Sequence, residues 1–261
     1  MKVKKFIQPN GHNQERKLPS VAMVFNGKVI ENEIEGYRRL TVSGRENIDF
    51  RTSTAPESNE ILTKDLNARV IRVTYEMSAE ENNEFQEKYR LLTRLLVTDA
   101  DVSIEFMDDP NVSYKGQVTH INEIQPTSNI VIGAFEIYCA SPWKEEKATV
   151  VKGNPMKIRL KSGYDTKPNQ IKLVVKENTN RLTVRNATTG RRIVLSGDYE
   201  EDDVIIVRIA NNLITKNNQN IMHELNFTET DFHKFLLTGN DDIDAVPSST
   251  ELEMIVKARW L

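Results

Sequence analysis

The sequence predicts a mainly β protein of two domains, with one helix in the first domain. Its 261 residues suffice for two domains at about 150 residues per domain. Short runs of alternating apolar and polar residues recur along the chain, which is typical of half-buried strands. Apolar residues recur convincingly at helical spacing in only one segment, so we expect the single helix there.

Composition shifts divide the chain into three parts. Residues 1–20 are polar and basic and contain two prolines, which predicts a flexible N-terminal arm. Residues 21–141 form the predicted first domain. Residues 142–261 form the second, because Ser141-Pro142 and the charged residues after Trp143 end the first strand pattern.

The first domain should open with a β-hairpin, since Asn26-Gly27 stands between two apolar runs and suits a type I′ turn. Residues 57–67 are polar and patternless, which predicts a loop with room for a projecting element. The clearest strand covers residues 68–77. Its four inward residues alternate with polar ones and are Ile71, Val73, Tyr75 and Met77.

The predicted helix runs from Glu80 to about Leu96. Ser78 and Glu81 have the spacing of a capping box before it. Its apolar stripe should pack on the first-domain sheet and comprises Phe85, Tyr89, Leu92 and Leu96. Strands should follow at 102–106, 112–121 and 130–139, with a turn at 108–111.

The second domain shows alternating runs at the spacing of about 8 to 12 residues that is typical of a β-sandwich. The runs cover 156–160, 171–175, 182–184, 193–195, 204–206, 213–214 and 252–258. A short helix is predicted only over residues 229–236.

Few residues suggest chemistry. His223 and His233 are nine residues apart, which fits no zinc motif, and His12 and His120 have no companion. Cys139 is the only cysteine; it excludes an intramolecular disulfide and fits a buried apolar position better than a nucleophile. We therefore predict no catalytic, cofactor-binding or metal-binding residues.

Two acidic clusters contain the carboxylates that a metal site needs. Glu200, Glu201, Asp202 and Asp203 precede a strand and fit a solvated turn. Asn240, Asp241, Asp242 and Asp244 resemble a calcium loop in spacing, but the glycine and glutamate of that motif are missing. Trp143 and Trp260 could stack on a sugar ring, although packing against a neighbour suits their positions equally well.

The composition also limits the partners. Basic and acidic residues nearly balance, at 35 and 38, so direct nucleic-acid binding is not expected. No apolar run approaches the roughly 18 residues of a membrane span, and the first 20 residues lack the apolar core of a signal peptide. We expect a protein made in the cytoplasm that binds no membrane.

The order of several segments resembles the distal tail proteins of siphophages. The segments are FNG at 25–27, RVIRVTYEM, the leucine-rich helix, DVSIEFMDDPNVSYKGQV, FEIYCASPW, GDYEEDDVIIVRIANNLITKNN, FHKFLLTGNDDIDA and the closing ARWL. The resemblance runs from about Val21 to Leu261 and depends on this order, since no single motif is diagnostic. The arm before Phe25 is longer than is usual in that family.

The resemblance implies a non-enzymatic virion protein of the tail tip. Its N-terminal domain would be a ring-forming β-sandwich with one helix, and its C-terminal domain a galectin-like β-sandwich. Six copies would form a ring hub that joins the tail tube to the baseplate and the host-adsorption apparatus. The implied partners are other copies of the chain, the tail tube protein, a baseplate or fibre protein, and the tape-measure protein.

Two other classes of function remain open from the sequence. The first is a carbohydrate-binding β-sandwich that recognises a bacterial cell-wall glycan, which requires exposed aromatics on a concave surface. The second is a glycan or peptide hydrolase, which requires two carboxylates about 5 to 9 Å apart in a cleft. No such pair stands out in the sequence.

Overall fold

The computed structural model describes residues 21–55, 57–58, 60–124 and 129–261. The predicted N-terminal arm, residues 1–20, lies outside them. The chain divides into two compact units. The first comprises the described residues within Met1–Pro110 and Lys115–Ser141, and the second comprises Asn111–Tyr114 and Pro142–Leu261.

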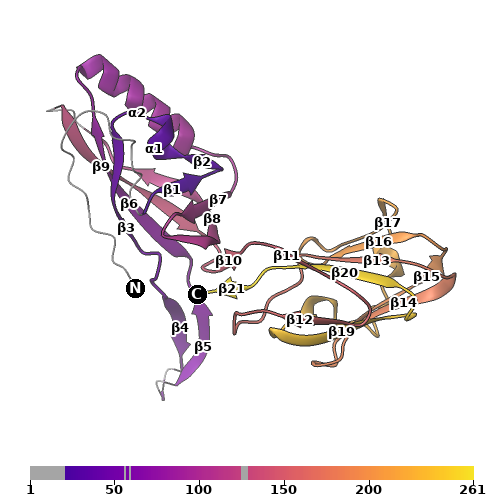
Figure 1. The fold of residues 1–261 in the computed structure, drawn as a ribbon. Coiled ribbons are helices and arrows are strands. Elements are labelled where there is room, and N and C mark those ends of the chain that lie inside the picture. The colour runs from indigo at the N-terminus through magenta and orange to yellow at the C-terminus, as the bar shows by residue number, and fades with distance from the viewer. Residues whose placement is uncertain (1–20, 56, 59, 125–128) are drawn as a thin grey trace. The chain divides into compact units, whose positions relative to one another are not determined.

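The first unit is built on an antiparallel sheet with the strand order β2-β1-β7-β8-β9-β6-β3 (Figure 1). The strands are β1 (Met23–Phe25), β2 (Lys28–Val29), β3 (Tyr37–Ser43), β6 (Arg69–Ser78), β7 (Val102–Phe106), β8 (Asp109–Ile121) and β9 (Ile130–Cys139). Strands β6 and β9 pair over their full lengths, with Ile71 opposite Ile137 and Val73 opposite Phe135. All four are buried, so the alternation in the sequence identified the inner face correctly.

The predicted first hairpin is confirmed. Asn26 and Gly27 connect β1 to β2 with φ of 49° and 77°, the left-handed conformations that a type I′ turn requires at both positions. The short helix α1 (Ile30–Glu33), which no sequence pattern predicted, follows directly. The turn predicted at 108–111 is wrong by about two residues, because Asp109 already belongs to β8.

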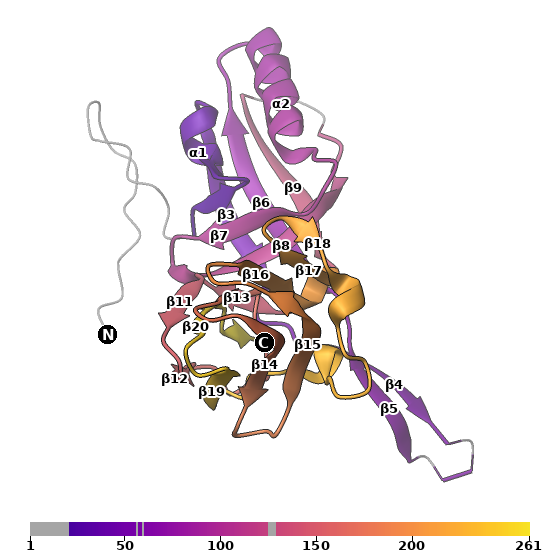
Figure 2. The ribbon, with the colours of Figure 1, turned by 90° about the vertical axis from the view of Figure 1, so that its right-hand side faces the viewer.

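The predicted helix is confirmed as α2 (Asn82–Leu96), the one helix longer than four residues in the described chain. Its stripe is turned inward: Phe85, Leu92 and Leu96 are buried, and Tyr89 is partly buried. Figure 1 and Figure 2 both show the helix lying along one face of the sheet.

The capping box is wrong. The cap residue is Glu81, and no side chain caps the helix there. Instead, Glu84 reaches back and accepts a hydrogen bond from the Glu80 N–H at 2.8 Å. Its other oxygen lies 2.5 Å from Lys88 Nζ, one turn further on. A carboxylate in the first turn also suits the positive end of the helix dipole, so Glu84 has the role that the predicted capping box assigned to Glu81.

The loop predicted over residues 57–67 is also wrong in part. Residues Ile61–Leu66 are a strand, β5, which pairs with β4 (Phe50–Thr54) as a separate two-stranded sheet. This hairpin runs away from the rest of its unit in both ribbon views (Figure 1, Figure 2). The pattern was missed because neither strand has a buried face to impose alternation.

The second unit is a β-sandwich of a six-stranded and a four-stranded sheet, with the orders β11-β20-β13-β16-β17-β18 and β12-β19-β14-β15. The first sheet contains β11 (Thr149–Lys152), β13 (Gln170–Val174), β16 (Val204–Arg208), β17 (Leu213–Lys216), β18 (Gln219–Asn220) and β20 (Glu251–Val256). The second contains β12 (Met156–Arg159), β14 (Thr179–Asn186), β15 (Arg192–Tyr199) and β19 (Asn240–Val246).

One continuous core fills the space between the two sheets, since inward residues of both belong to the same buried cluster. The mainly β fold class is thus confirmed. Two short strands, β10 (Lys144–Glu146) and β21 (Arg259–Trp260), pair at the ends of this unit, and β10 also pairs with Val112 and Ser113 of β8.

Two predictions for this unit are wrong. The helix predicted over 229–236 shrinks to a single 3-10 turn, η3 (Phe232–Lys234), which follows a similar turn η2 (Met222–Glu224). A third such turn is η1 (Ile209–Asn211). The segment from Asn240, predicted as a loop, is the central strand β19.

Candidate functional site

The residues weighed for catalysis do not come together. His120 is exposed on β8, whereas His223 and His233 are exposed on η2 and η3; His12 lies outside the described residues. Cys139 is fully buried, and burial raises the pKa of its thiol to about 11. Across residues 21–261, leaving aside the gaps, no three His, Cys, Asp or Glu side chains are grouped as a metal site would need.

The acidic stretch from Asn240 is structural. Because β19 alternates, Asp241 points into the unit and is fully buried, while Asp242 and Asp244 pair with Arg159 and Arg185 on the strand's other face. Asp241 accepts hydrogen bonds from the backbone N–H groups of Thr238 and Gly239 at 2.8 and 2.9 Å. Residues that point to opposite faces cannot share one ion.

The other acidic cluster forms a turn, as predicted. Asp203 accepts a hydrogen bond from the Glu200 N–H at 2.9 Å, and this bond is the first cause of the lowered pKa of its carboxyl. Asn217 Nδ2 donates to the same carboxylate at 2.7 Å. The cluster thus fastens the connection between β15 and β16.

The two tryptophans pack within the second unit. Trp143 meets the ring of Tyr164 edge-on at 5.1 Å, and the Arg259 guanidinium lies 4.1 Å from its ring centre. Trp260 donates from Nε1 to Glu146 at 3.0 Å. Both indoles are therefore engaged by their own chain, which favours the packing interpretation over a sugar platform.

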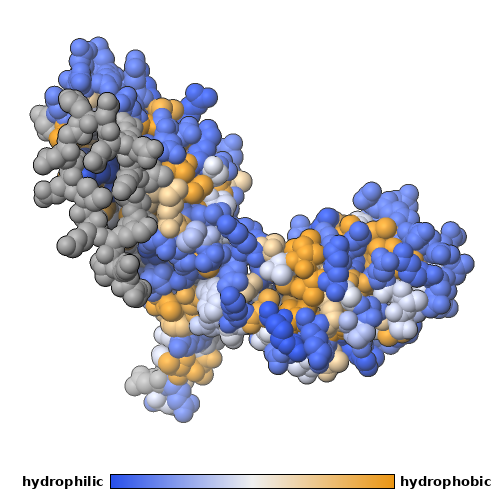
Figure 3. Space-filling model, in the orientation of Figure 1, coloured by the Kyte–Doolittle hydropathy of each residue, from blue (hydrophilic) through white to orange (hydrophobic). Residues whose placement is uncertain are grey.

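The hairpin β4–β5 has almost no buried side chains. Nearly every residue of both strands is exposed, and the apolar side chains Phe50, Ile61 and Leu62 are among them (Figure 3). The bonds that hold it are local: Ser53 and Thr63 share a hydrogen bond across the strands at 2.6 Å. A two-stranded ribbon without a core is marginally stable by itself, so this hairpin is suited to bind a surface.

A second apolar surface lies on the outer face of β6 and β9. Val70 stands opposite Tyr138 in the register, and both are exposed. Ile132 is exposed further along the same face. Between them Arg72 and Glu136 form an ion pair at 3.0 Å. We call Val70, Ile132 and Tyr138 with this pair the outer patch.

The sequence contained a weak signal for these surfaces. Ile61-Leu62 is an apolar pair within a polar segment, and Val70 stands on the polar side of the alternating strand 68–77. Ile132 and Tyr138 belong to the nearly continuous apolar run 130–139. Scattered exposed apolar residues are normal in folded proteins, so only the structure reveals that these gather. None of the described helices is long and apolar enough to cross a bilayer.

Comparison with known proteins gives a family for the second unit. Residues 161–260 match the family described as siphovirus-type tail component, C-terminal domain. No curated protein sequence matches the chain significantly.

Solved structures share the fold of nearly the whole chain. The Dit (gp 19.1) protein of phage SPP1, described as a paradigm of hub adsorption apparatus in phages that infect Gram-positive bacteria, superposes with a TM-score of 0.76 at 17% identity over 92% of this chain and 99% of that one. A chain of the phage P2 baseplate in its activated conformation with Ca gives 0.50 at 10% identity, over 88% and 93%. The same baseplate with Sr gives 0.51 at 11% identity. At these identities the likeness establishes the fold.

Proposed function

We propose that this chain is a structural protein of the phage tail hub and that six copies of it close into a ring. The match of residues 161–260 to the siphovirus-type tail component family and the fold shared with a phage hub protein support this proposal. The ring would join the tail tube to the tail tip and its adsorption apparatus. The number six is what the resemblance to siphophage distal tail proteins implies. Its place in the virion would be the distal end of the tail.

The main observation that supports a ring is the exposed hairpin β4–β5. Its strands bury nothing against their own unit, and Phe50, Ile61 and Leu62 remain in contact with water. Covering these side chains is favourable by about 25 cal/mol per Å² of apolar surface. We propose that a second copy of the chain covers these side chains in the assembly.

A second copy offers a suitable surface in the outer patch. It contains three exposed apolar side chains, Val70, Ile132 and Tyr138. Its ion pair, Arg72 with Glu136, can also form hydrogen bonds with polar groups of an incoming strand. A hairpin that binds a different surface of its neighbour makes a head-to-tail interface, and such interfaces close into rings when the rotation between copies is suitable.

The remaining partners follow from a hub position. We propose the tail tube protein on one side of the ring, a baseplate or fibre protein on the other, and the tape-measure protein in the channel. Residues 21–141 would close the ring, and residues 142–261 would project outward from it. The scattered histidines and the buried thiol fit a role that requires surfaces and no reaction.

The mass of the full-length protein in solution tests the proposal. Light scattering after size exclusion should give about 179 kDa, which is six times the 29.9 kDa of one chain. The double substitution Ile61→Lys with Leu62→Lys should reduce this to the mass of one chain, since charged side chains cannot be buried unpaired at the interface.

A matched control is Val150→Lys, which places the same charge at an exposed apolar position of the second unit. It should leave the mass unchanged. A wild-type protein that runs as a monomer, or a hairpin variant that still runs at the hexamer mass, would contradict the proposal.

A further inference from the structure

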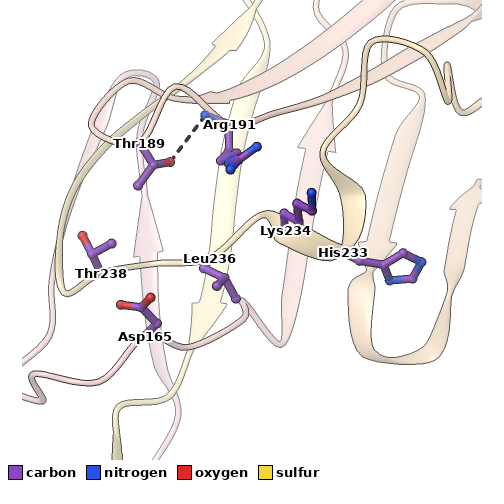
Figure 4. A pocket seen from close by; sticks show the side chains of 7 residues that line it. All are labelled: Asp165, Thr189, Arg191, His233, Lys234, Leu236 and Thr238. Atoms are coloured by element: carbon purple, nitrogen blue, oxygen red, sulfur yellow. Dashed lines mark hydrogen bonds between the residues drawn. The ribbon is translucent and has the colours of Figure 1, made fainter. Parts of the chain in front are cut away.

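The second unit has two adjoining hollows that no part of the hub role requires. One has a volume of about 400 Å³ and the other about 250 Å³, and His233 and Lys234 of η3 line both. The other residues of the larger hollow are Asp165, Thr189, Arg191, Leu236 and Thr238 (Figure 4). The larger volume is within the roughly 300 to 1,000 Å³ of typical small-molecule sites.

The charges of these hollows are nearly compensated. Arg191 Nη1 lies 2.6 Å from the carboxylate of Asp231, which lines the smaller hollow. Lys234 shares the larger hollow with Asp165. The two cations, Arg191 and Lys234, are thus matched by two carboxylates, Asp165 and Asp231, and His233 is also present. A phosphate or another strong anion would meet these carboxylates as well as the cations, so a neutral ligand fits better.

The polar groups suit a ligand that carries hydroxyls. Arg191 and Lys234 only donate hydrogen bonds, and Asp165 and Asp231 only accept. The Thr189 hydroxyl accepts from the Arg191 N–H at 3.4 Å and can still donate, whereas the Thr238 hydroxyl donates to Asp241 at 3.1 Å and can still accept. Figure 4 shows Arg191 and Lys234 on one side of the larger hollow and Asp165 and Thr238 on the other, with the His233 ring directed away from them. A polyol offers donors and acceptors in equal number and can satisfy both sides.

An aromatic ring completes the arrangement. Phe227 lines the smaller hollow together with Met222 and Leu225. Its side chain is 71% exposed, more than any other large apolar residue in the described part of the chain. Leaving a phenyl ring in water forgoes the favourable burial of its surface. The apolar face of a sugar ring can cover it while the hydroxyls remain bonded at the ring's edge.

We propose that these hollows bind an uncharged oligosaccharide, with one sugar stacked on Phe227 and the next bonded among Arg191, Lys234 and Asp165. This activity is separate from ring closure, since none of its residues belongs to the β4–β5 hairpin or the outer patch. It makes the second unit a sugar-binding module on a structural scaffold.

The test is a titration of the full-length protein with trimers of N-acetylglucosamine, of β-linked glucose and of α-linked glucose, followed by saturation-transfer NMR and calorimetry. At least one trimer should bind saturably, with a Kd of about 0.1 to 10 mM. Phe227→Ala and Lys234→Met should each weaken binding about tenfold or more. Val150→Ala, at an exposed position elsewhere in the same unit, should leave it unchanged.

Three results would overturn the inference: no trimer binds saturably, Phe227→Ala behaves as Val150→Ala does, or inorganic phosphate binds in the hollows while the sugars do not. The mass of each sample is measured in parallel. A hexamer that binds no sugar refutes this inference alone, whereas a monomer that binds sugar refutes the ring alone.

Discussion

Arg39 and Glu31 form an ion pair in the interior of the first unit. Nη2 of Arg39 lies 3.0 Å from Oε1 of Glu31, and the two side chains are 0% and 4% exposed. Arg39 also donates from Nη1 to the carbonyl of Val21 at 2.8 Å, so one guanidinium connects β3 to α1 and to the start of the described chain. Burial raises the pKa of Glu31, and the nearby charge of Arg39 only partly opposes this.

Replacing Arg39 by Met should destabilise the protein by about 3 to 5 kcal/mol at neutral pH, because Glu31 then stays buried with no cation beside it. Chemical denaturation measures the loss. The control is Arg72→Met, which breaks a partly exposed pair with Glu136 and should cost less than about 1 kcal/mol. Equal losses for the two variants would show that the Arg39 pair is not buried in solution.

The deficit of Arg39→Met should also depend on pH. Without Arg39 the folded-state pKa of Glu31 rises further above its unfolded value, so the folded state favours the protonated carboxyl more strongly. A group with a raised folded pKa stabilises fully below its unfolded pKa and loses that contribution as pH rises through the folded value. The deficit should therefore start to grow above the already raised folded pKa of Glu31 in the wild type, because below that pH Glu31 is protonated in both folded proteins; a deficit that shrinks with rising pH would contradict this.

Leu92 provides a test of helix packing. It is fully buried on α2, whereas its neighbour Leu91 is 37% exposed. Leu92→Ala should cost about 2 to 5 kcal/mol through lost burial and the cavity left behind. Leu91→Ala, the same change one residue away, should cost less than about 1 kcal/mol. Urea titration of both variants decides whether the stripe faces the sheet.

Cys139 should be inert in the folded protein. Burial raises the pKa of its thiol to about 11, so at pH 8 it is almost wholly protonated, and the reactive species is the thiolate. An aromatic disulfide reagent should release no colour from the native protein and one equivalent after unfolding in urea. Fast reaction of the native protein at pH 8 would show that the end of β9 opens readily.

The second unit should fold when separated. Every residue of its buried core lies between Met156 and Val256, so a fragment from Pro142 to Leu261 keeps that core whole and should melt cooperatively as a monomer. It loses the pairing of β10 with Val112 and Ser113. The fragment 21–140 should carry the self-association. Hexamers of the second fragment would reverse the proposed roles.

The sequence by itself determined the elements whose pattern is local. The alternation through Ile71, Val73, Tyr75 and Met77 and the stripe through Phe85, Leu92 and Leu96 each mark a buried face, because the period of an apolar pattern follows from the geometry of one element. Asn26-Gly27 fixed a turn for the same reason, since its backbone preference needs no distant partner.

Only the tertiary structure decided the rest, because it depends on contacts between residues far apart in the chain. Asp241 can be fully buried in β19 because Asn186, 55 residues away, donates a hydrogen bond to it at 2.9 Å; in the sequence it belongs to a stretch with the spacing of a calcium loop. The hairpin β4–β5 has no buried face and hence no period. The larger hollow exists only where the segments around Asp165, Thr189 and Lys234 meet. A polar residue can be buried, and an apolar one left exposed, when the partner that compensates it is distant in sequence or belongs to another molecule.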